Sequence, residues 1–264
     1  MYDDITSRAV WSVIAALTIS IALPLAAHAE TPACNARTDL VRFANPLAHL
    51  GHRLSTHQPV TIVAIGSSST AGAGASSAAA TYPSRLEVEL SQRFPGQQIK
   101  VLNRGVGGEE VADMLKRFDQ GVIAAKPDLV IWQLGTNSVI RDHKSADYGA
   151  SIHFGISRLR AVGADVILID PQYAPKVIAK PEVAQMVELI ALTAKRDSVD
   201  LYPRFEVMRH WRDDDHLDFK TFVSPDGLHM NDWSYACLAK SLGQAIAEAA
   251  QRPVLSASVH AFAD

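Results

Sequence analysis

The sequence predicts an α/β fold of three layers, α/β/α, in which a parallel sheet carries helices on both faces. The first observation behind this prediction is a continuous, mostly β-branched apolar run at Val60–Ile65, which is typical of a strand buried on both faces. The second is the alternation of strand-like and helix-like segments after this run, which indicates a parallel sheet. With 264 residues, 48% of them hydrophobic, the chain is long enough to bury one large core.

The expected elements follow one another without repeats, low-complexity tracts or long linkers. Short runs rich in branched apolar residues predict five strands, at Val60–Ile65, Ile99–Leu102, Leu129–Leu134, Val166–Ile169 and Val199–Tyr202. Apolar residues at helical spacing predict five helices, at Pro83–Phe94, Glu109–Phe118, Tyr148–Ala161, Pro181–Arg196 and from about Asn231 to Glu248. We expect one domain over residues 59–252, with a lead-in at 30–58 and a tail at 253–264.

Residues 1–29 have the features of a secretory signal peptide. An apolar stretch over Ala9–Ala27 follows Arg8 and ends in Ala27-His28-Ala29, the A-x-A pattern of a cleavage site. We expect cleavage after Ala29 and a periplasmic or secreted protein that is not stably inserted in a membrane. Asp3 and Asp4 weaken the usual positive start, and the stretch approaches the roughly 20 residues that span a bilayer, so an uncleaved anchor is the alternative.

The charge and cysteine content agree with an exported protein. The net charge of -3 and the pI near 6.4, without a block of Lys or Arg, argue against a nucleic-acid-binding surface or a polybasic membrane patch. We expect a monomer with a small-molecule or glycan substrate and no nucleic-acid partner. A disulfide between Cys34 and Cys237 would tie the start of the mature chain to its last helix, and two unrelated thiols are the alternative.

Four polar or glycine-rich motifs follow predicted strands or precede the last helix. They are Gly66-Ser67-Ser68-Ser69, Asn103–Gly108, Gly135-Thr136-Asn137, and Asp226-Gly227-Leu228-His229, the last before a helix that Asn231 or Asp232 would cap. The carboxyl ends of parallel strands meet at one edge of a sheet, where α/β proteins bind ligands. A serine, backbone donors at glycines, an amide and an Asp/His pair are the groups that acyl transfer requires. Each motif alone is also typical of a turn or cap, but their joint occurrence favours catalysis.

In order and spacing, these motifs resemble the four blocks of the SGNH hydrolases, also called the GDSL esterase/lipase family. The resemblance covers roughly residues 60–248. The family's first block, Gly-Asp-Ser-Leu, falls on Gly66–Ser69, so that Ser68 corresponds to the nucleophile and Ser67 stands in place of the aspartate. The conserved glycine of the second block falls on Gly108.

The third and fourth blocks are also present. Gly-x-Asn-Asp matches Gly135 and Asn137, with Ser138 in place of the final aspartate, and Asp-x-x-His matches Asp226 and His229 without change. The resemblance implies a flavodoxin-like sheet and an exported carboxylic ester hydrolase that needs no cofactor or metal. Because neither missing aspartate belongs to the triad, we expect altered loop hydrogen bonding with catalysis retained.

The resemblance also implies a role for each site residue. Ser68 attacks the ester carbonyl, His229 is the base, and Asp226 orients the imidazole. The oxyanion hole is formed by the backbone N–H groups of Ser68 and Gly108 and by the side-chain amide of Asn137.

Other interpretations stay open or are weaker. A deacetylase of a cell-wall or exported polysaccharide and a non-catalytic carbohydrate-binding module are the alternatives to a general esterase. A nucleotide-binding loop starting at Gly72 lacks its third glycine, where Ser77 stands. The run His210–His216 holds metal-ligand residue types without tetrahedral ligand spacing and indicates a solvated loop. We expect Gln172–Pro175, which follow a predicted strand, to line the substrate cleft.

Overall fold

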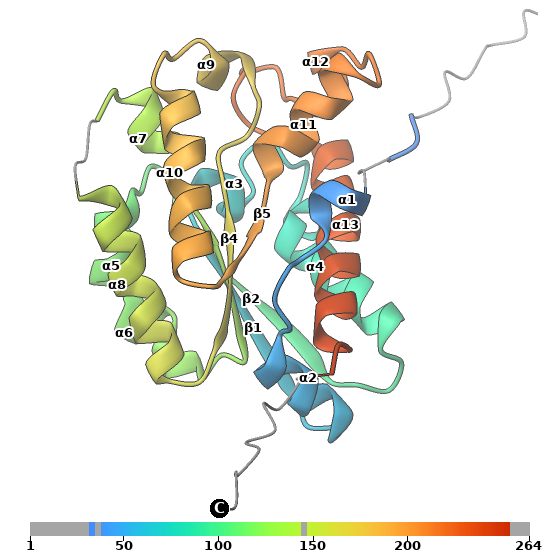
Figure 1. Cartoon of the computed structure of the whole chain (residues 1–264). Helices are drawn as coiled ribbons and strands as arrows, with labels where there is room; N and C mark the ends of the chain where they lie inside the picture. Colours follow the sequence, from blue (N-terminus) through green and yellow to red (C-terminus); the bar gives the residue numbers. More distant parts are fainter. Residues whose placement is uncertain (1–31, 35–37, 144–146, 254–264) are drawn as a thin grey trace, which may run out of the picture. The chain divides into compact units, whose positions relative to one another are not determined.

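A five-stranded parallel sheet forms the centre of the molecule (Figure 1). The computed structural model describes residues 32–34, 38–143 and 147–253, and its large compact unit begins at Cys34. The strands are β1 (Val60–Gly66), β2 (Ile99–Gly105), β3 (Leu129–Gln133), β4 (Asp165–Ile169) and β5 (Asp200–Tyr202). Their order, β2-β1-β3-β4-β5, is that of a flavodoxin-like sheet. The predicted three-layer α/β/α fold is therefore confirmed.

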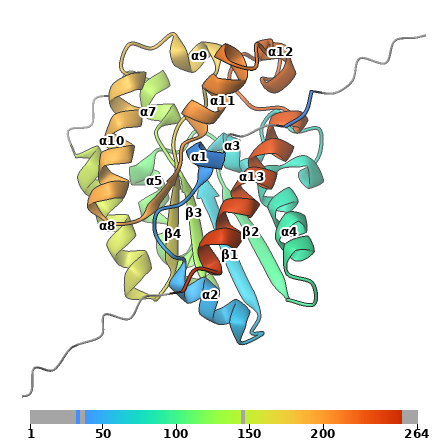
Figure 2. The same cartoon turned by 45° about the vertical axis from the view of Figure 1, so that its right-hand side comes forward.

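Helices cover both faces of this sheet (Figure 2). One face carries α1 (Thr38–Val41), α2 (Ala48–Ser55), α4 (Tyr82–Arg93) and α13 (Asp232–Ala250), and the other carries α5 (Val111–Lys116), α6 (Phe118–Gly121), α8 (Tyr148–Ala161) and α10 (Val183–Arg196). Shorter or edge helices are α3 (Ser68–Ala71), α7 (Thr136–Ile140), α9 (Pro175–Ile178), α11 (Arg204–Asp213) and α12 (Phe219–Phe222), with 3-10 turns η1 (Ala78–Ala80) and η2 (Ile123–Ala125). In Figure 1, α3, α9, α11 and α12 lie toward the end of the sheet where the strands finish.

The apolar runs of the strands supply both faces of the sheet with core residues. On β1, Ile62 and Ala64 pack into the core beneath α4 and α13, whereas Val63 and Ile65 pack into the core beneath α5 and α8. All four side chains are fully buried. The alternation follows from the two-residue side-chain period of a strand, and it explains why the run contains no polar position in its centre.

The predicted helices are present, with changes at their ends. The segment expected as one helix at Glu109–Phe118 divides into α5 and α6 around Arg117. Asn231 caps α13, and its side chain accepts a hydrogen bond from the Ser234 N–H at 3.2 Å, as the sequence predicts. The segments that form α1, α2, α7, α9, α11 and α12 were not expected to be helical, because most of these helices are too short for apolar periodicity to reveal.

Part of the lead-in belongs to the core. Phe43, Leu47 and Leu50 are buried beside α13, and a disulfide joins Cys34 to Cys237 on that helix with a Cα separation of 5.4 Å. The disulfide expected from the sequence is thus present. The predicted signal peptide and residues 254–264 of the predicted tail lie outside the described residues. Within the described ranges, no helix is both long and apolar enough to cross a membrane.

The expectation of a solvated loop at His210–His216 is wrong for the first half of this run. Residues up to Asp213 continue α11, because Trp211 is buried in the core and anchors the last turn of the helix. His210 contacts the carboxylate of Asp214 at 2.6 Å. Across the described residues, no group of three or more His, Cys, Asp or Glu side chains is arranged to hold a metal ion.

Candidate active site

Ser68 begins the short helix α3 directly after β1. Gly66 ends the strand where a side chain does not fit, because a Cβ there would lie 2.2 Å from Thr70 Oγ1. The Ser67 carbonyl then accepts hydrogen bonds from the N–H groups of Thr70 and Ala71, at 3.1 and 2.9 Å, which turns the chain into α3. Ser67 and Ser69 are each 1% exposed, whereas Ser68 is half-buried. Of the three serines, Ser68 is therefore the one that a substrate can reach.

His229 approaches this serine from the loop between α12 and α13. The loop is closed by an antiparallel bridge between Val223 and Met230. Gly74, after α3, lies against it so closely that a Cβ there would be 2.1 Å from the Met230 carbonyl oxygen and 3.1 Å from His229 Cβ. His229 Nε2 lies 2.8 Å from Ser68 Oγ. The structure thus brings together two predicted residues that are separated by 161 positions in the sequence.

Asp226 holds the other side of the imidazole. Its Oδ2 lies 2.5 Å from His229 Nδ1, where it favours a proton on Nδ1. Nε2 is then unprotonated and can accept a hydrogen bond from the Ser68 hydroxyl. Its Oδ1 accepts hydrogen bonds from the Ser224 hydroxyl at 2.7 Å and from the N–H groups of Leu228 and His229 at 2.9 Å each. Burial by itself raises the pKa of Asp226, but these hydrogen bonds outweigh it and lower the pKa well below the ordinary range. The Asp226 carboxylate is therefore ionised at neutral pH.

The three predicted oxyanion donors lie on three segments: Ser68 at the start of α3, Gly108 on the loop after β2, and Asn137 on α7. Gly108 has a φ of +80°, in the left-handed region that favours glycine. The Asn137 side-chain amide donates one hydrogen bond, at 2.8 Å, to the carbonyl of Glu109, the residue after Gly108. An amide carries two N–H donors, so the second one is available to a ligand. Among the described residues, the backbone N–H groups of Ser68 and Gly108 donate to no partner.

The two glycines before Gly108 differ in what surrounds them. A Cβ on Gly105 would lie 2.1 Å from the backbone nitrogen of Ala71, so β2 and α3 touch through their backbones here. A Cβ on Gly107 would meet no atom within 4 Å. The Val106 N–H also donates to the Gly66 carbonyl at 3.0 Å. Gly105 and Val106 therefore hold the loop of Gly108 against α3, the helix that begins at Ser68.

Ser67 and Ser138, which stand where the Gly-Asp-Ser-Leu and Gly-x-Asn-Asp patterns have aspartates, form hydrogen bonds with polar side chains outside the four motifs. The Ser67 N–H and hydroxyl both donate to Gln133 Oε1, at 2.9 and 3.0 Å. The Ser138 hydroxyl donates to Glu110 Oε2 at 2.9 Å. Gln133, a polar residue inside the apolar run of β3, was a signal in the sequence, whereas nothing marked Glu110 apart from its place beside the second block.

The expectation that Gln172–Pro175 line the cleft is wrong for two of these residues. Gln172 and Ala174 are fully buried. The amide oxygen of Gln172 accepts a hydrogen bond from the Thr136 hydroxyl at 2.9 Å, and its amide nitrogen donates one to the Leu228 carbonyl at 3.0 Å. Gln172 therefore ties the segment after β4 to α7 and to the loop of His229, and its side chain is not free to contact a substrate.

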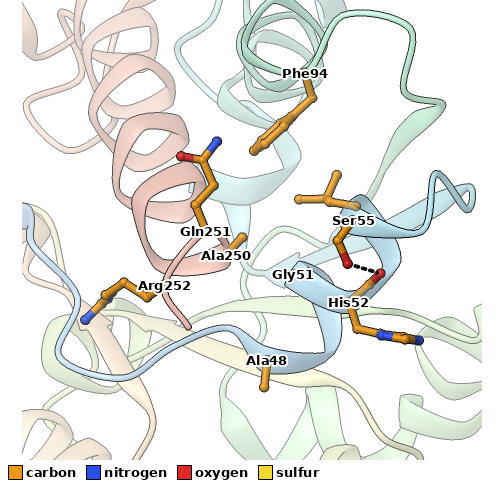
Figure 3. A pocket seen from close by; sticks show the side chains of 9 residues that line it. Ala48, Gly51, His52, Ser55, Phe94, Ala250, Gln251 and Arg252 are labelled. Atoms are coloured by element: carbon orange, nitrogen blue, oxygen red, sulfur yellow. Dashed lines mark hydrogen bonds between the residues drawn. The ribbon is translucent and has the colours of Figure 1, made fainter. Parts of the chain in front are cut away.

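A cavity of about 530 Å³ lies elsewhere, at the edge of the sheet where the strands begin (Figure 3). It is lined by α2, by Phe94 at the end of α4 and by the end of α13. The Ser55 hydroxyl in this cavity donates to the backbone carbonyl of His52, at 3.0 Å, and not to an imidazole nitrogen. None of the predicted site residues lines it. The chemical groups of the candidate active site are at the opposite edge.

Comparison with known proteins gives one family. A model of the non-GDSL lipase-like family matches residues 33–252. An acetylxylan esterase of Geobacillus stearothermophilus is 29% identical over 94 residues, which cover 32% of this chain and 43% of that protein. An arylesterase of Vibrio mimicus is 26% identical over 151 residues, which cover 55% of this chain and 73% of that protein. The chain thus aligns with less than half the length of the acetylxylan esterase.

Solved structures share the fold. An acetyl-xylooligosaccharide esterase from Geobacillus superposes with a TM-score of 0.61 at 21% identity, over 71% of this chain and 94% of that one. A two-domain esterase active on acetylated mannans superposes with a TM-score of 0.69 at 16% identity, over 83% of this chain and 58% of that one. At such identities the superpositions support the three-layer fold alone.

Proposed function

Because the chain belongs to the non-GDSL lipase-like family, we propose that it is a carboxylic ester hydrolase with Ser68 as the nucleophile of a Ser-His-Asp triad. The family match confirms the resemblance to the SGNH hydrolases. The observation that carries the proposal is the 2.8 Å contact between Ser68 Oγ and His229 Nε2, with Asp226 on the other imidazole nitrogen. A nucleophile, its base and a group that orients the base are the parts that acyl transfer requires.

In the first half of the reaction, Ser68 Oγ bonds to the ester carbonyl carbon while its proton passes to His229 Nε2. The carbonyl oxygen becomes an oxyanion, which the N–H groups of Ser68 and Gly108 and the Asn137 amide stabilise. When this intermediate collapses, the bond to the alcohol oxygen breaks, and His229 gives its proton to the leaving alcohol. Asp226 stabilises the imidazolium that exists between these two proton transfers.

In the second half, water takes the place of the alcohol. His229 Nε2 accepts a proton from water as the water oxygen bonds to the carbonyl carbon of the acyl-enzyme. The same donors stabilise the second oxyanion. Collapse then breaks the bond to Ser68 Oγ, the proton returns to the serine, and the carboxylic acid is released. No step in this sequence calls for a cofactor or a metal.

We infer a short acyl group, such as acetyl on a glycan, as the substrate class. The support is the sequence similarity to an acetylxylan esterase, a protein that acts on an acetylated polysaccharide. The arylesterase relative keeps small non-glycan esters as the second candidate. A series of p-nitrophenyl esters of increasing acyl length, run beside acetylated xylan and mannan, separates the two. The glycan proposal requires release of acetate from at least one polysaccharide.

We propose that the protein is exported as a monomer after cleavage at Ala29. The disulfide between Cys34 and Cys237 supports the export, since such bonds persist in oxidising compartments. Amino-terminal sequencing of the protein from the producing cell tests cleavage. An intact Met1 on membrane-bound protein would instead identify the uncleaved anchor.

The serine assignment is tested by three neighbouring variants. Ser68→Ala should abolish p-nitrophenyl acetate hydrolysis and leave thermal unfolding unchanged, because only the reacting hydroxyl is lost. Ser69→Ala is the matched control, since the Ser69 hydroxyl is buried and has no hydrogen-bond partner among the described residues. Loss of activity in Ser67→Ala with an active Ser68→Ala would move the nucleophile by one residue. A native chain that a fluorophosphonate does not label at Ser68 would favour the carbohydrate-binding module.

A further inference from the structure

Glu110 is a carboxylate outside the triad that joins two segments of the candidate site. It is the N-cap of α5, where its side chain and that of Asp113 satisfy each other's backbone N–H groups in a capping box. Its side chain is 17% exposed. Burial alone raises the pKa of Glu110, but the hydrogen bonds it accepts lower the pKa below its ordinary value. Glu110 is therefore a fixed, ionised acceptor.

The same carboxylate also holds α7. Oε2 accepts a hydrogen bond from the Ser138 hydroxyl at 2.9 Å, and Oε1 accepts one from Arg141 Nη1 at 2.7 Å. His143, just after α7, places Nδ1 3.0 Å from Oε1. Ser138 is 1% exposed, so its hydroxyl is held away from competing water. Three side chains from one short segment thus converge on one carboxylate from another loop.

Two of the proposed oxyanion donors, the Asn137 amide and the Gly108 N–H, lie close in the chain to the contact between Glu110 and Ser138. Asn137 directly precedes Ser138 on α7, and Gly108 lies two residues before Glu110. The Asn137 amide already bonds to the Glu109 carbonyl at 2.8 Å. Arg141 also lies over Gly108, because a Cβ on that glycine would be 3.3 Å from Arg141 Nη2. A movement of α7 relative to Glu110 would therefore displace the two donors relative to each other.

We propose that Glu110 is a positioning residue, which holds the Asn137 amide and the Gly108 N–H in register for the oxyanion. The inference rests on the proposed function, because it needs these groups to be the oxyanion donors. Donors stabilise a developing charge only when they are aimed before the reaction starts, and a displacement of about 1 Å costs about 10² in rate. Glu110 also supplies, across the loop contact, a carboxylate beside position 138, where the Gly-x-Asn-Asp pattern has its own.

The experiment compares Glu110→Ala, Asn137→Ala and the double variant in p-nitrophenyl acetate hydrolysis. Asn137→Ala should lower kcat by about 10²–10³. Glu110→Ala should lower kcat by about 10- to 100-fold with KM nearly unchanged, because the serine and the binding surface remain. In the double variant, kcat should fall little below that of Asn137→Ala, since a residue that acts through Asn137 has no further effect once the amide is gone.

Two controls separate positioning from general stability. Asp113→Ala removes the other half of the same capping box without touching α7, so it should lower the unfolding temperature but leave kcat at the parental value. Glu110→Gln should rescue much of the activity, because its amide oxygen still accepts from Arg141 and its nitrogen faces the Ser138 hydroxyl. Equal kcat losses in Asp113→Ala and Glu110→Ala would overturn the proposal.

The outcomes also distinguish this proposal from the proposed function. If the kcat losses of Glu110→Ala and Asn137→Ala multiply in the double variant, Glu110 acts independently and the positioning role is refuted. If Asn137→Ala is costly but Glu110→Ala is not, the positioning role fails and the oxyanion hole stands. If Asn137→Ala costs nothing, the oxyanion assignment itself fails. If Glu110→Ala does not fold, the double-variant comparison is made with Ser138→Ala, which removes one of the same contacts.

Discussion

Asp226→Asn tests the triad most sharply, because the hydrogen bonds around the carboxylate decide how the new amide must lie. Oδ1 accepts from three donors, the Ser224 hydroxyl and the N–H groups of Leu228 and His229, at 2.7, 2.9 and 2.9 Å. Only the amide oxygen of asparagine can take that position. The amide nitrogen is therefore forced to the place of Oδ2, which lies 2.5 Å from His229 Nδ1.

An N–H group in that place favours the wrong tautomer of the histidine. His229 Nδ1 has to accept a hydrogen bond in place of donating one, so the ring proton moves to Nε2. Nε2–H cannot accept the proton of Ser68, although the two side chains stay 2.8 Å apart in the parent structure. The corresponding change in a serine protease triad lowers kcat by about 10⁴, equivalent to about 5.4 kcal/mol of transition-state stabilisation. We expect a loss of this size here.

The assay is p-nitrophenyl acetate hydrolysis near neutral pH, with thermal unfolding measured on the same samples. Asp232→Asn is the matched control. Asp232 is the first residue of α13, near the site, and it accepts hydrogen bonds from Ser76 and does not touch His229. This control should keep its activity. If Asp226→Asn retained more than about a tenth of parental kcat, the assignment of Asp226 as the orienting group would be refuted.

Two further predictions follow from packing and from burial. Gly105→Ala should lower both stability and activity, because the new Cβ would lie 2.1 Å from the Ala71 nitrogen and displace α3. Gly107→Ala should change neither, because a Cβ there meets no atom within 4 Å. Equal unfolding temperatures for the two variants would contradict this prediction. Burial raises the pKa of Asp170 to about 7, so the folded protein keeps a proton that the unfolded chain releases above about pH 4. Stability should therefore fall as pH rises between these values, by at most about 1.4 kcal/mol per pH unit. Asp170→Asn should flatten that slope in urea unfolding at about pH 5 to about pH 8, and an unchanged slope would exclude Asp170 as its source.

The parts of the fold that the sequence predicted best are those with strong local patterns. All five strands were found because each is a short apolar run between polar or glycine-containing turns. The helices α8 and α10 were found because their apolar faces repeat at helical spacing. The sequence of residues 38–55 predicts only a lead-in, because the reason for its helices is tertiary: Leu47 and Leu50 are buried against α13, which lies about 200 positions further along the chain.

The candidate site divides in the same way. Each chemical group could be named in advance, because it stands in a contiguous motif after a strand or before a helix. The contact between Asp226 and His229 is local, since the two residues are three positions apart. The partners of Ser67 and Ser138 could not be named, because Gln133 and Glu110 reach them from other elements. Gln172 was placed wrongly for the same reason, since its burial depends on Thr136 and Leu228.

The sequence by itself determined the fold class and the types of reacting group, because hydrophobic period and turn chemistry are written in neighbouring residues. The tertiary structure decided how those groups are held. Ile65 pairs with Trp132 in the parallel register of β1 and β3, and this register sets Gln133 beside Ser67. Such registers depend on the packing of whole strands and helices, which no single motif contains. The motif thus predicts Ser68 as the candidate nucleophile, while the orientation of its side chain toward His229 required the folded sheet.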